Sequence, residues 1–314
     1  MKKFFTLIQG IIMGVAELIP GVSGSNFALI MGIYDDYIIF LDKLTNFLSN
    51  ILGGIFSSST RKNIKSSFKN VPWSFGISLL IGMFLASVLF SNLITYLLED
   101  NARYVYALFF GLVAGSIFVP LKEIGKIESI HFAIIIVTTI ILFIIFGIKP
   151  TSYGTNPPEV LLFVAGVIAV VGNVLPGVSG PFLLLLVGLY DFIISLLASV
   201  TTLQFDLEQI KKFAFFFAGQ LVGLAIFIKI LTYLLKKFPK TLMSILVGVI
   251  AASLRITYPF FTGTPDNKII ISPFSLPAYE LFVMTILILL GLFIVYLAGK
   301  LGADRKQVKK IEKS

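Results

Sequence analysis

The chain has 314 residues, no cysteine, 57% apolar residues and only 13% charged residues, and its mean hydropathy is +0.98. Soluble domains contain about 45–50% apolar and about 25% charged residues, so this composition favours an integral membrane protein and excludes a soluble enzyme, a disordered chain and a disulfide scaffold. In a membrane protein the net charge of +9 is best used to find the side of the membrane on which basic residues gather. It does not indicate a nucleic-acid partner.

A helix needs about 20 apolar residues to cross a hydrocarbon core about 30 Å thick. Six apolar runs predict crossings, of which the second and the fifth are short or tilted: 73–98, 104–121, 131–148, 213–235, 241–256 and 277–300. Two further apolar regions, 4–52 and 159–203, are interrupted near the middle by Pro-Gly. We expect each of them to be a re-entrant hairpin built on a broken helix. The predicted fold class is an all-α polytopic membrane protein.

Basic residues gather in four pieces of the chain, which are the N-terminus, 57–70, 236–240 and the C-terminal tail. By the positive-inside rule these pieces, and with them both termini, are predicted to be cytoplasmic. Six crossings agree with this assignment only if 4–52 and 159–203 each return to the side from which they entered. Residues 42–70 end in the basic run and predict an amphipathic segment on anionic lipid heads or, over the last ten residues, a solvated linker.

The chain contains an internal repeat. Residues 10–41 align without gaps on 166–197, and the segment Pro-Gly-Val-Ser-Gly is identical in both copies. The two halves, 1–150 and 151–314, each consist of one hairpin and three crossings. Because three is odd, the second half is expected to be inverted relative to the first. Inverted repeats with broken helices are typical of secondary transporters, whose binding site lies where the repeats meet.

The repeated Pro-Gly-Val-Ser-Gly segment cannot continue a helix. Backbone groups freed in lipid cost several kcal/mol each, so such a break is expected beside a polar cavity. A new helix then begins with Ser23 or Ser25, and with Ser179, as N-caps, and its N-terminus suits an anion such as phosphate. Gly24 and Gly180 would let an oxyanion approach the backbone closely. The alternative is a tight turn that only packs helices.

Four ionisable residues near the breaks are candidates for function. Glu17 precedes the first break and aligns with Asn173, and it is either a protonatable group coupled to an anionic ligand or a cap on the opposing helix. Asp35 and Asp191 follow Gly-x-Tyr in the two copies and are either further proton-coupling groups or interfacial caps. Arg255 ends the fifth predicted crossing, and its guanidinium either binds phosphate or extends to the interface.

The predicted phosphate-binding residues come from both breaks and the fifth crossing: Glu17, Pro20, Gly21, Ser23, Gly24, Ser25, Asn26, Asn173, Pro176, Gly177, Ser179, Gly180 and Arg255. The residues proposed for proton coupling are Glu17, Asp35 and Asp191. With no cysteine and one histidine, the sequence predicts no metal site, and it indicates no catalytic residue and no cofactor.

Two segments carry a resemblance to a known family: GIIMGVAELIPGVSGSNFALIMGIYDDYI and GNVLPGVSGPFLLLLVGLYD. Over almost the whole chain the sequence resembles the bacterial polyprenyl-phosphate (undecaprenyl-phosphate) translocases, formerly known only as a membrane domain of unknown function. The resemblance implies a flippase that returns undecaprenyl phosphate (C55-P) from the outer to the inner leaflet of the cytoplasmic membrane for cell-envelope synthesis. It carries over to the matching positions 17–26 and 173–180, whereas Arg255 is a physical inference. The implied partners are the lipid carrier and the bilayer, with a homodimer left open.

Two alternatives remain open. Undecaprenyl-diphosphate phosphatases also contain inverted repeats and re-entrant hairpins, but their Pro-Gly-x-Ser-Arg-Ser motif has an arginine where this chain has Gly24 and Gly180. Of their Glu-x-x-x-Glu pattern only Glu17 is present, so a phosphatase would lack its phosphate-binding arginine and one acid. A transporter of a small soluble anion would share the site but would need no lateral opening to lipid.

Overall fold

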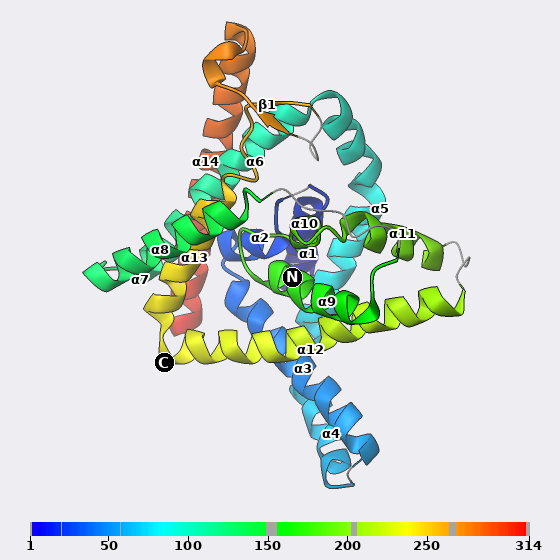
Figure 1. Ribbon diagram of the computed structural model, residues 1–314. Coiled ribbons are helices and arrows are strands. Elements are labelled where there is room, and N and C mark those ends of the chain that lie inside the picture. The colour runs from blue at the N-terminus through cyan, green and yellow to red at the C-terminus, as the bar shows by residue number, and fades with distance from the viewer. Residues whose placement is uncertain are drawn as a thin grey trace.

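The protein is helical along almost its whole length (Figure 1). The computed structural model describes residues 2–19, 21–56, 58–148, 156–201, 206–263 and 268–311. Its helices are, in chain order, α1 (Lys2–Glu17), α2 (Gly24–Ile30), α3 (Tyr34–Phe56), α4 (Ser58–Asn70), α5 (Trp73–Asp100), α6 (Ala102–Ser116), α7 (Phe118–Ile124), α8 (Ser129–Ile145), α9 (Glu159–Val174), α10 (Gly180–Leu186), α11 (Tyr190–Thr201), α12 (Leu207–Lys237), α13 (Pro239–Ser253) and α14 (Ala278–Ile311). A 3₁₀ turn, η1 (Pro273–Ser275), and an antiparallel pair of two-residue strands, β1 (Phe261–Thr262) and β2 (Ile269–Ile270), precede α14. The predicted all-α membrane class is confirmed.

Four helical stretches are long and apolar enough to cross a membrane: α5, residues Ala102–Ile124, α12 and the Ala278–Lys300 part of α14. They correspond to the first, second, fourth and sixth predicted crossings. The third and the fifth, α8 and α13, are apolar but have only 17 and 15 residues. At 1.5 Å per residue these helices are about 22–26 Å long, which is short of a hydrocarbon core about 30 Å thick. All six predicted crossings are therefore helices, and four of them have full length.

The second predicted crossing, 104–121, is divided at Ile117 between α6 and α7. Pro120 follows within α7 and has no N–H group to donate to the carbonyl of Ser116. One helical hydrogen bond is therefore missing at the junction, and α7 begins there as a separate short helix.

The two regions with a repeated break each contain three helices, which are α1, α2 and α3 in the first half and α9, α10 and α11 in the second. A second break in each region was not predicted, and it lies at Gly32 and Gly188, whose φ angles are +67° and +69°. Glycine adopts this left-handed conformation without the steric cost of a Cβ and ends the preceding helix. The shared Gly-x-Tyr-Asp signal thus marks the end of a short helix and the start of a third one.

Glycines bring the helices of each half into close contact. The pair α1 and α5 and the pair α9 and α12 both have glycines that face a backbone carbonyl across the interface. These contacts are Gly10 with Leu79, Gly82 with Leu7, Gly166 with Phe216 and Gly219 with Phe163. Each contact in the first half has its counterpart at the aligned position of the second. Small residues allow such close approach where lipid provides no hydrophobic force between helices.

Helices of the two halves also pack against each other. Helix α6 of the first half packs against α14 of the second, and α13 of the second half packs against α8 of the first (Figure 1). Gly111 of α6 faces the backbone of Ile288 in α14, and Gly248 of α13 faces Thr138 in α8. Each half therefore packs one helix against the last helix of the other half, α6 against α14 and α13 against α8.

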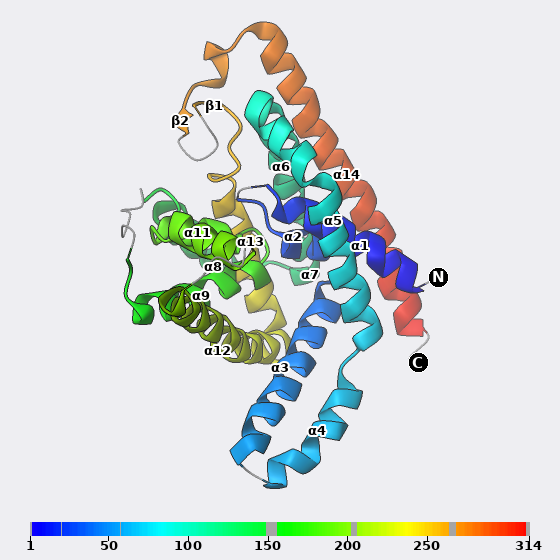
Figure 2. The ribbon, with the colours of Figure 1, turned by 90° about the vertical axis from the view of Figure 1, so that its right-hand side faces the viewer.

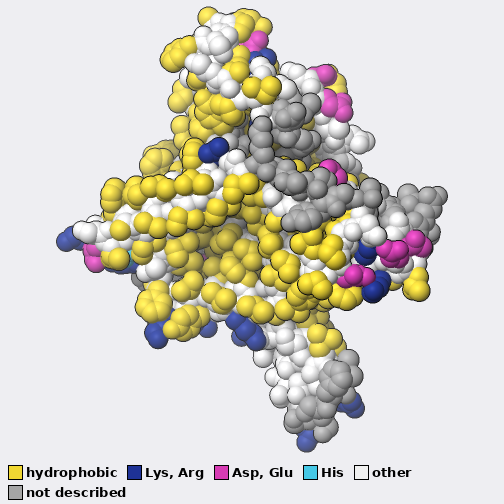
Figure 3. Space-filling model, in the orientation of Figure 1, with side chains coloured by type: hydrophobic (Ala, Val, Ile, Leu, Met, Phe, Trp, Pro, Cys, Tyr) yellow, Lys and Arg dark blue, Asp and Glu magenta, His cyan; other side chains and the backbone are white. Residues whose placement is uncertain are grey.

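Helices α3 and α4 form a hairpin that projects from the rest of the molecule (Figure 2). The predicted surface segment 42–70 is thus the end of α3 and all of α4, held by contacts among Phe47, Phe68 and Trp73. In Figure 3 hydrophobic side chains cover the middle of the face, while Lys and Arg without Asp or Glu occupy its lower edge and the tip of this hairpin. An apolar belt bordered by cations is the surface expected of a protein that spans a membrane.

Gly219→Ala is expected to lower the free energy of unfolding by about 1–3 kcal/mol, because its Cβ would collide with the Phe163 carbonyl and separate α9 from α12. Gly299→Ala is the matched control, since a Cβ there would meet nothing within 4 Å. Alanine should leave stability unchanged or raise it by up to about 1 kcal/mol at that position. Thermal unfolding of both variants in one detergent measures the difference, and equal unfolding temperatures would contradict the tight α9–α12 contact.

Candidate functional site

The first break joins the end of α1 to the start of α2. Gly21 takes a left-handed conformation with φ +81°, and the chain then turns into α2 at Gly24. The backbone N–H of Gly24 donates to Oε1 of Glu17 at 2.7 Å. Glu17 therefore caps the helix of its own region, because it accepts from an N–H group that has no partner within the helix. Pro20 lies outside the described residues.

The second break repeats this turn with an amide in place of the carboxylate. Gly177 has φ +94°, and the N–H of Gly180 donates to Oδ1 of Asn173 at 2.9 Å. Pro176 is buried in the turn. A Cβ on Gly180 would collide with the Asn173 amide oxygen, so glycine is required for this contact. Both breaks are thus closed by a side-chain oxygen seven residues upstream of the donor.

The serines of the two breaks differ in their hydrogen bonds. Ser179 is the N-cap of α10 as predicted, and its Oγ accepts from the N–H of Phe182 at 3.3 Å. Ser23 holds the N-cap position of α2 but makes no such bond. Its Oγ instead lies 2.6 Å from Oγ of Ser25, which belongs to the first turn of α2, and both side chains are buried. The first break therefore holds a buried pair of hydroxyl groups.

Asn26 follows this pair and is fully buried. Its Oδ1 and Nδ2 atoms have no hydrogen-bond partner among the residues that the structure describes. A buried polar group without a partner costs about 1–3 kcal/mol, so its presence calls for a ligand or a functional reason. The aligned residue in the second break is Phe182, which packs against Phe146. The polar chemistry of the site is therefore concentrated in the first break.

The C-terminal end of α13 contacts both breaks. Gly21 lies against the side chain of Ile256, just after α13. Gly177 lies against Ile250 and Ser253, in the last turns of the same helix. The two breaks, which are far apart in the sequence, thus meet at one end of one helix.

The starts of α3 and α11 carry the two candidate aspartates. Asp35 and Asp191 lie in the first turns of these helices, where a negative charge is favourable. Asp35 is half-buried and Asp191 is exposed. Next to Asp35, the buried Tyr34 hydroxyl donates to the carbonyl of Val174 at 3.3 Å and so connects α3 to the end of α9.

Two cations lie near the end of α13. Arg255 is exposed, and its Nη1 donates to the carbonyl of Phe143 at 3.1 Å. Its guanidinium also lies 4.5 Å from the centre of the Phe143 ring. Arg255 therefore contacts α8 rather than either break. Lys268 is not among the predicted site residues, and in the sequence it is one of two charges in the long predicted loop 257–276. Its Nζ donates to the carbonyl of Ile256 at 2.8 Å and lies 3.4 Å from the centre of the Tyr106 ring. Lys268 is thus connected to the residue that covers Gly21.

Comparison with known proteins identifies the family. The undecaprenyl phosphate translocase-like family (VCA0040-like) matches residues 13–268, which include both breaks. The chain belongs to this family. It is 29% identical over 260 residues to a polyprenyl-phosphate transporter of Vibrio cholerae, covering 83% of this chain and 79% of that one. It is 28% identical over 314 residues to a polyprenyl-phosphate transporter of Staphylococcus aureus, covering 97% and 99%.

No solved structure matches this translocase-like chain. The names of the family and of the two relatives describe transport and not catalysis. They agree with the prediction that the chain is not an enzyme and count against the phosphatase alternative.

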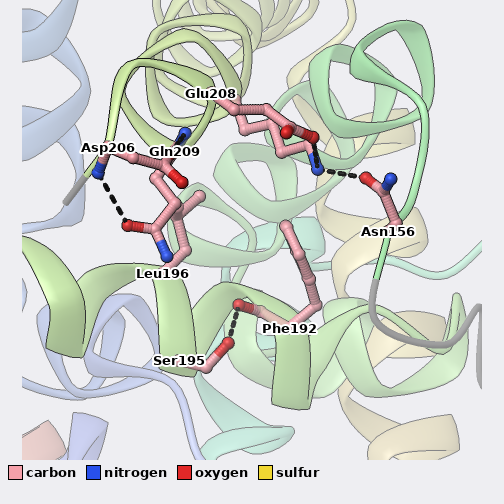
Figure 4. Close-up of a pocket in the computed structure, with 8 residues that line it drawn as sticks. Asn156, Phe192, Ser195, Leu196, Asp206, Glu208 and Gln209 are labelled. Atoms are coloured by element: carbon pink, nitrogen blue, oxygen red, sulfur yellow. Dashed lines mark hydrogen bonds and ion pairs between the residues drawn. The ribbon is translucent and has the colours of Figure 1, made fainter.

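This family member also has a polar pocket of about 360 Å³ between α11 and the start of α12 (Figure 4). Its buried cation is Lys212, whose Nζ lies 2.7 Å from Oε1 of Glu208 and also donates to Asn156. Dashed lines in Figure 4 mark these two contacts, at Asn156 and at Glu208. Because Glu208 already neutralises Lys212, we do not assign the phosphate to this pocket. The first half has Phe75 at the aligned position, where it packs on Phe40.

Asn173→Ala is expected to lower the free energy of unfolding by about 1 kcal/mol, because the Gly180 N–H loses the acceptor that caps α10. Asn173→Asp keeps an acceptor oxygen of the same reach and should unfold near the wild-type temperature. Thermal unfolding of both variants in one detergent tests the cap. If both variants unfolded at the wild-type temperature, the Asn173–Gly180 bond would contribute nothing to the fold.

Proposed function

We propose that this chain is a flippase that moves undecaprenyl phosphate (C55-P) from the outer to the inner leaflet of the bacterial cytoplasmic membrane, so that the carrier is reused in cell-envelope synthesis. Its family is described as undecaprenyl phosphate translocase-like, and two relatives are named polyprenyl-phosphate transporters. The observation that carries the proposal is the buried Asn26 amide without a partner in the described chain, beside the Ser23–Ser25 pair and Gly24. These groups supply hydrogen-bond donors for one phosphate at a break in the helix.

The donors at the first break suit the terminal oxygens of a phosphate monoester, which are strong hydrogen-bond acceptors. Asn26 offers the two N–H groups of its amide. The Ser23–Ser25 bond uses one hydroxyl hydrogen and leaves the other hydroxyl free to donate. Hydrogen bonds to a charged acceptor contribute about 1.5–3 kcal/mol each, so a few donors are sufficient to select an anion in this buried place.

Glu17 links the same site to a proton. Its carboxyl oxygen accepts from the Gly24 N–H and so occupies the donor that a phosphate oxygen would use. In the proposed mechanism the arriving phosphate displaces Glu17, and the displaced carboxyl binds a proton because two negative charges in a poorly hydrated site repel strongly. Asn173 makes the equivalent bond to Gly180 and cannot ionise, so the second break serves as a fixed counterpart.

The proposed transport motion is a movement of the two halves, 1–150 and 151–314, relative to each other. We propose that the halves are inverted and that each three-helix region re-enters the membrane from one side. The matched glycine contacts in the two halves and the pairing of α6 with α14 and of α13 with α8 support this symmetry. Figure 1 places the C-terminus beside the basic lower edge seen in Figure 3, which supports a cytoplasmic C-terminus under the positive-inside rule. Alternating access in such folds comes from one repeat rocking against the other.

Glu17→Gln is expected to flatten the pH dependence of C55-P transport, because glutamine still accepts from the Gly24 N–H but cannot take up a proton. The measurement is C55-P exposure on the two faces of proteoliposomes across a series of pH values. Asn173→Ala is the control, since it removes the equivalent cap without removing an ionisable group, and it should keep the wild-type pH profile. A wild-type pH profile in Glu17→Gln would refute proton coupling through this residue.

Asn26→Leu is expected to weaken C55-P binding about 10- to 100-fold, the equivalent of about 1.5–3 kcal/mol for a lost hydrogen bond to a charged group. The same change removes a polar group that has no partner in the described structure, so the unfolding temperature should stay equal or rise. Titration of C55-P into detergent-purified protein measures the affinity. Phe182→Leu changes the aligned position of the second break and serves as the control with wild-type affinity. If Asn26→Leu bound C55-P as tightly as the wild type, the phosphate would not lie at Asn26.

A further inference from the structure

The structure contains a cavity of about 1110 Å³ at the end of α2 opposite the first break. Its wall combines Leu29 and Ile30 of α2, Val119 of α7, and Leu292 and Tyr296 of α14. The wall is mainly apolar, whereas a path for a soluble anion is lined with polar groups. Pockets for small molecules have volumes of about 300–1,000 Å³, so this cavity is large enough for a long apolar ligand.

The cavity is open to the outer surface of two candidate membrane-spanning stretches. Three of its lining residues, Phe118, Phe293 and Tyr296, are 67%, 55% and 67% exposed. They lie on α7 and on α14, and the latter is one of the full-length candidate membrane spans. An apolar chain can therefore enter from the bilayer without leaving an apolar environment.

The mouth of the cavity carries two cations. Lys122 of α7 and Lys300 of α14 both line it, are exposed and form no ion pair with a described residue. Asp35 and Glu123 line the cavity as well. An apolar wall with two available ammonium groups at its edge complements a lipid that has a long hydrocarbon tail and one phosphate head.

The short helix α2 connects this cavity to the first break. Its first residues adjoin the Ser23–Ser25 pair and Asn26, and its last residues, Leu29 and Ile30, form part of the cavity wall. A seven-residue helix is about 10 Å long, so the two places are one short helix apart.

We infer that this cavity is a second binding site for polyprenyl phosphate, which holds the isoprenoid chain against α2, α7 and α14 and the phosphate at Lys122 and Lys300. It receives the lipid after the head has left the first break and before release into the inner leaflet. This inference rests on the proposed function, because the ligand is the lipid that the flippase moves. It also separates a lipid transporter from a transporter of a small soluble anion, which needs no apolar cavity.

Gly299→Trp tests the cavity directly. Gly299 lines it, and a Cβ at this position would meet nothing within 4 Å, so a large side chain there is expected to occupy part of the cavity. Losing contact with two buried methylene groups already weakens binding about tenfold, and we expect at least that loss of C55-P affinity in this variant. Leu289→Trp is the matched control, because Leu289 lies on the same helix, is 58% exposed and does not line the cavity.

The site is mapped with a polyprenyl phosphate that carries a photoreactive group on its tail, in liposomes of phosphatidylethanolamine and phosphatidylglycerol. Crosslinks are expected at Val119, Leu292 and Tyr296 in the wild type and in Leu289→Trp, and should disappear in Gly299→Trp. Lys122→Gln combined with Lys300→Gln should weaken binding of the phosphate lipid but not of undecaprenol, which lacks the phosphate. Excess C55-P should compete for the crosslinks, and excess phosphatidylglycerol or inorganic phosphate should not.

Three results would overturn the inference in different ways. If the wild type transports C55-P but crosslinks only near the first break, the cavity is not a site and the proposed function stands. If phosphatidylglycerol competes as well as C55-P, the cavity holds ordinary bilayer lipid. If the wild type neither binds nor transports C55-P, the proposed function fails and the inference fails with it.

Discussion

A helix that breaks within lipid leaves backbone N–H groups without partners, and no water is there to bind them. Each of these groups must therefore find an acceptor in the protein, and the remainder of the structure depends on this constraint. The chain meets this constraint twice, with Glu17 Oε1 for the Gly24 N–H and with Asn173 Oδ1 for the Gly180 N–H. Each bond fixes the direction in which a short helix leaves the end of a longer one. The meeting of both breaks at the end of α13 depends on these two turns, because a continuous helix would carry the chain past that place.

The two copies use the same backbone for different chemistry. Glu17 of the first break aligns with Asn173 of the second, and Asn26 aligns with Phe182. Only the first copy therefore combines an ionisable cap with a buried amide that has no partner in the described chain. Under the proposed function, the matched helices of such a repeat would move symmetrically, and a few side chains that differ between the copies would recognise the ligand. In the proposed mechanism the apolar cavity at the far end of α2 would hold the tail of the lipid whose head binds at the first break.

The sequence alone was enough to predict the membrane class, helices in all six expected crossings, four of which are long enough to span, both Pro-Gly breaks, the N-cap at Ser179 and the family. These features depend on local properties, such as apolar runs of sufficient length, residues that cannot continue a helix and a motif that recurs in the same order. The repeat also contains a glycine before Tyr-Asp at the second break, Gly32 and Gly188, but the predicted hairpins have only the Pro-Gly break in each region. The glycine is present in the sequence, but whether a helix ends at it depends on how the helices pack.

Only the tertiary structure decided which polar residues lack partners and which cations lie near the breaks. In the sequence Asn26 is one more polar residue of the motif. Its side-chain amide lacks a hydrogen-bond partner in the described structure because α2 is buried. Arg255 was chosen from its place at a helix end, yet its guanidinium contacts Phe143, while Lys268 reaches the residue beside Gly21 from a distant loop. Such contacts join segments far apart in the chain, and no local pattern of residue types encodes them. The sequence therefore determined where the two Pro-Gly breaks lie, and the tertiary structure showed the second break of each region and what surrounds every break.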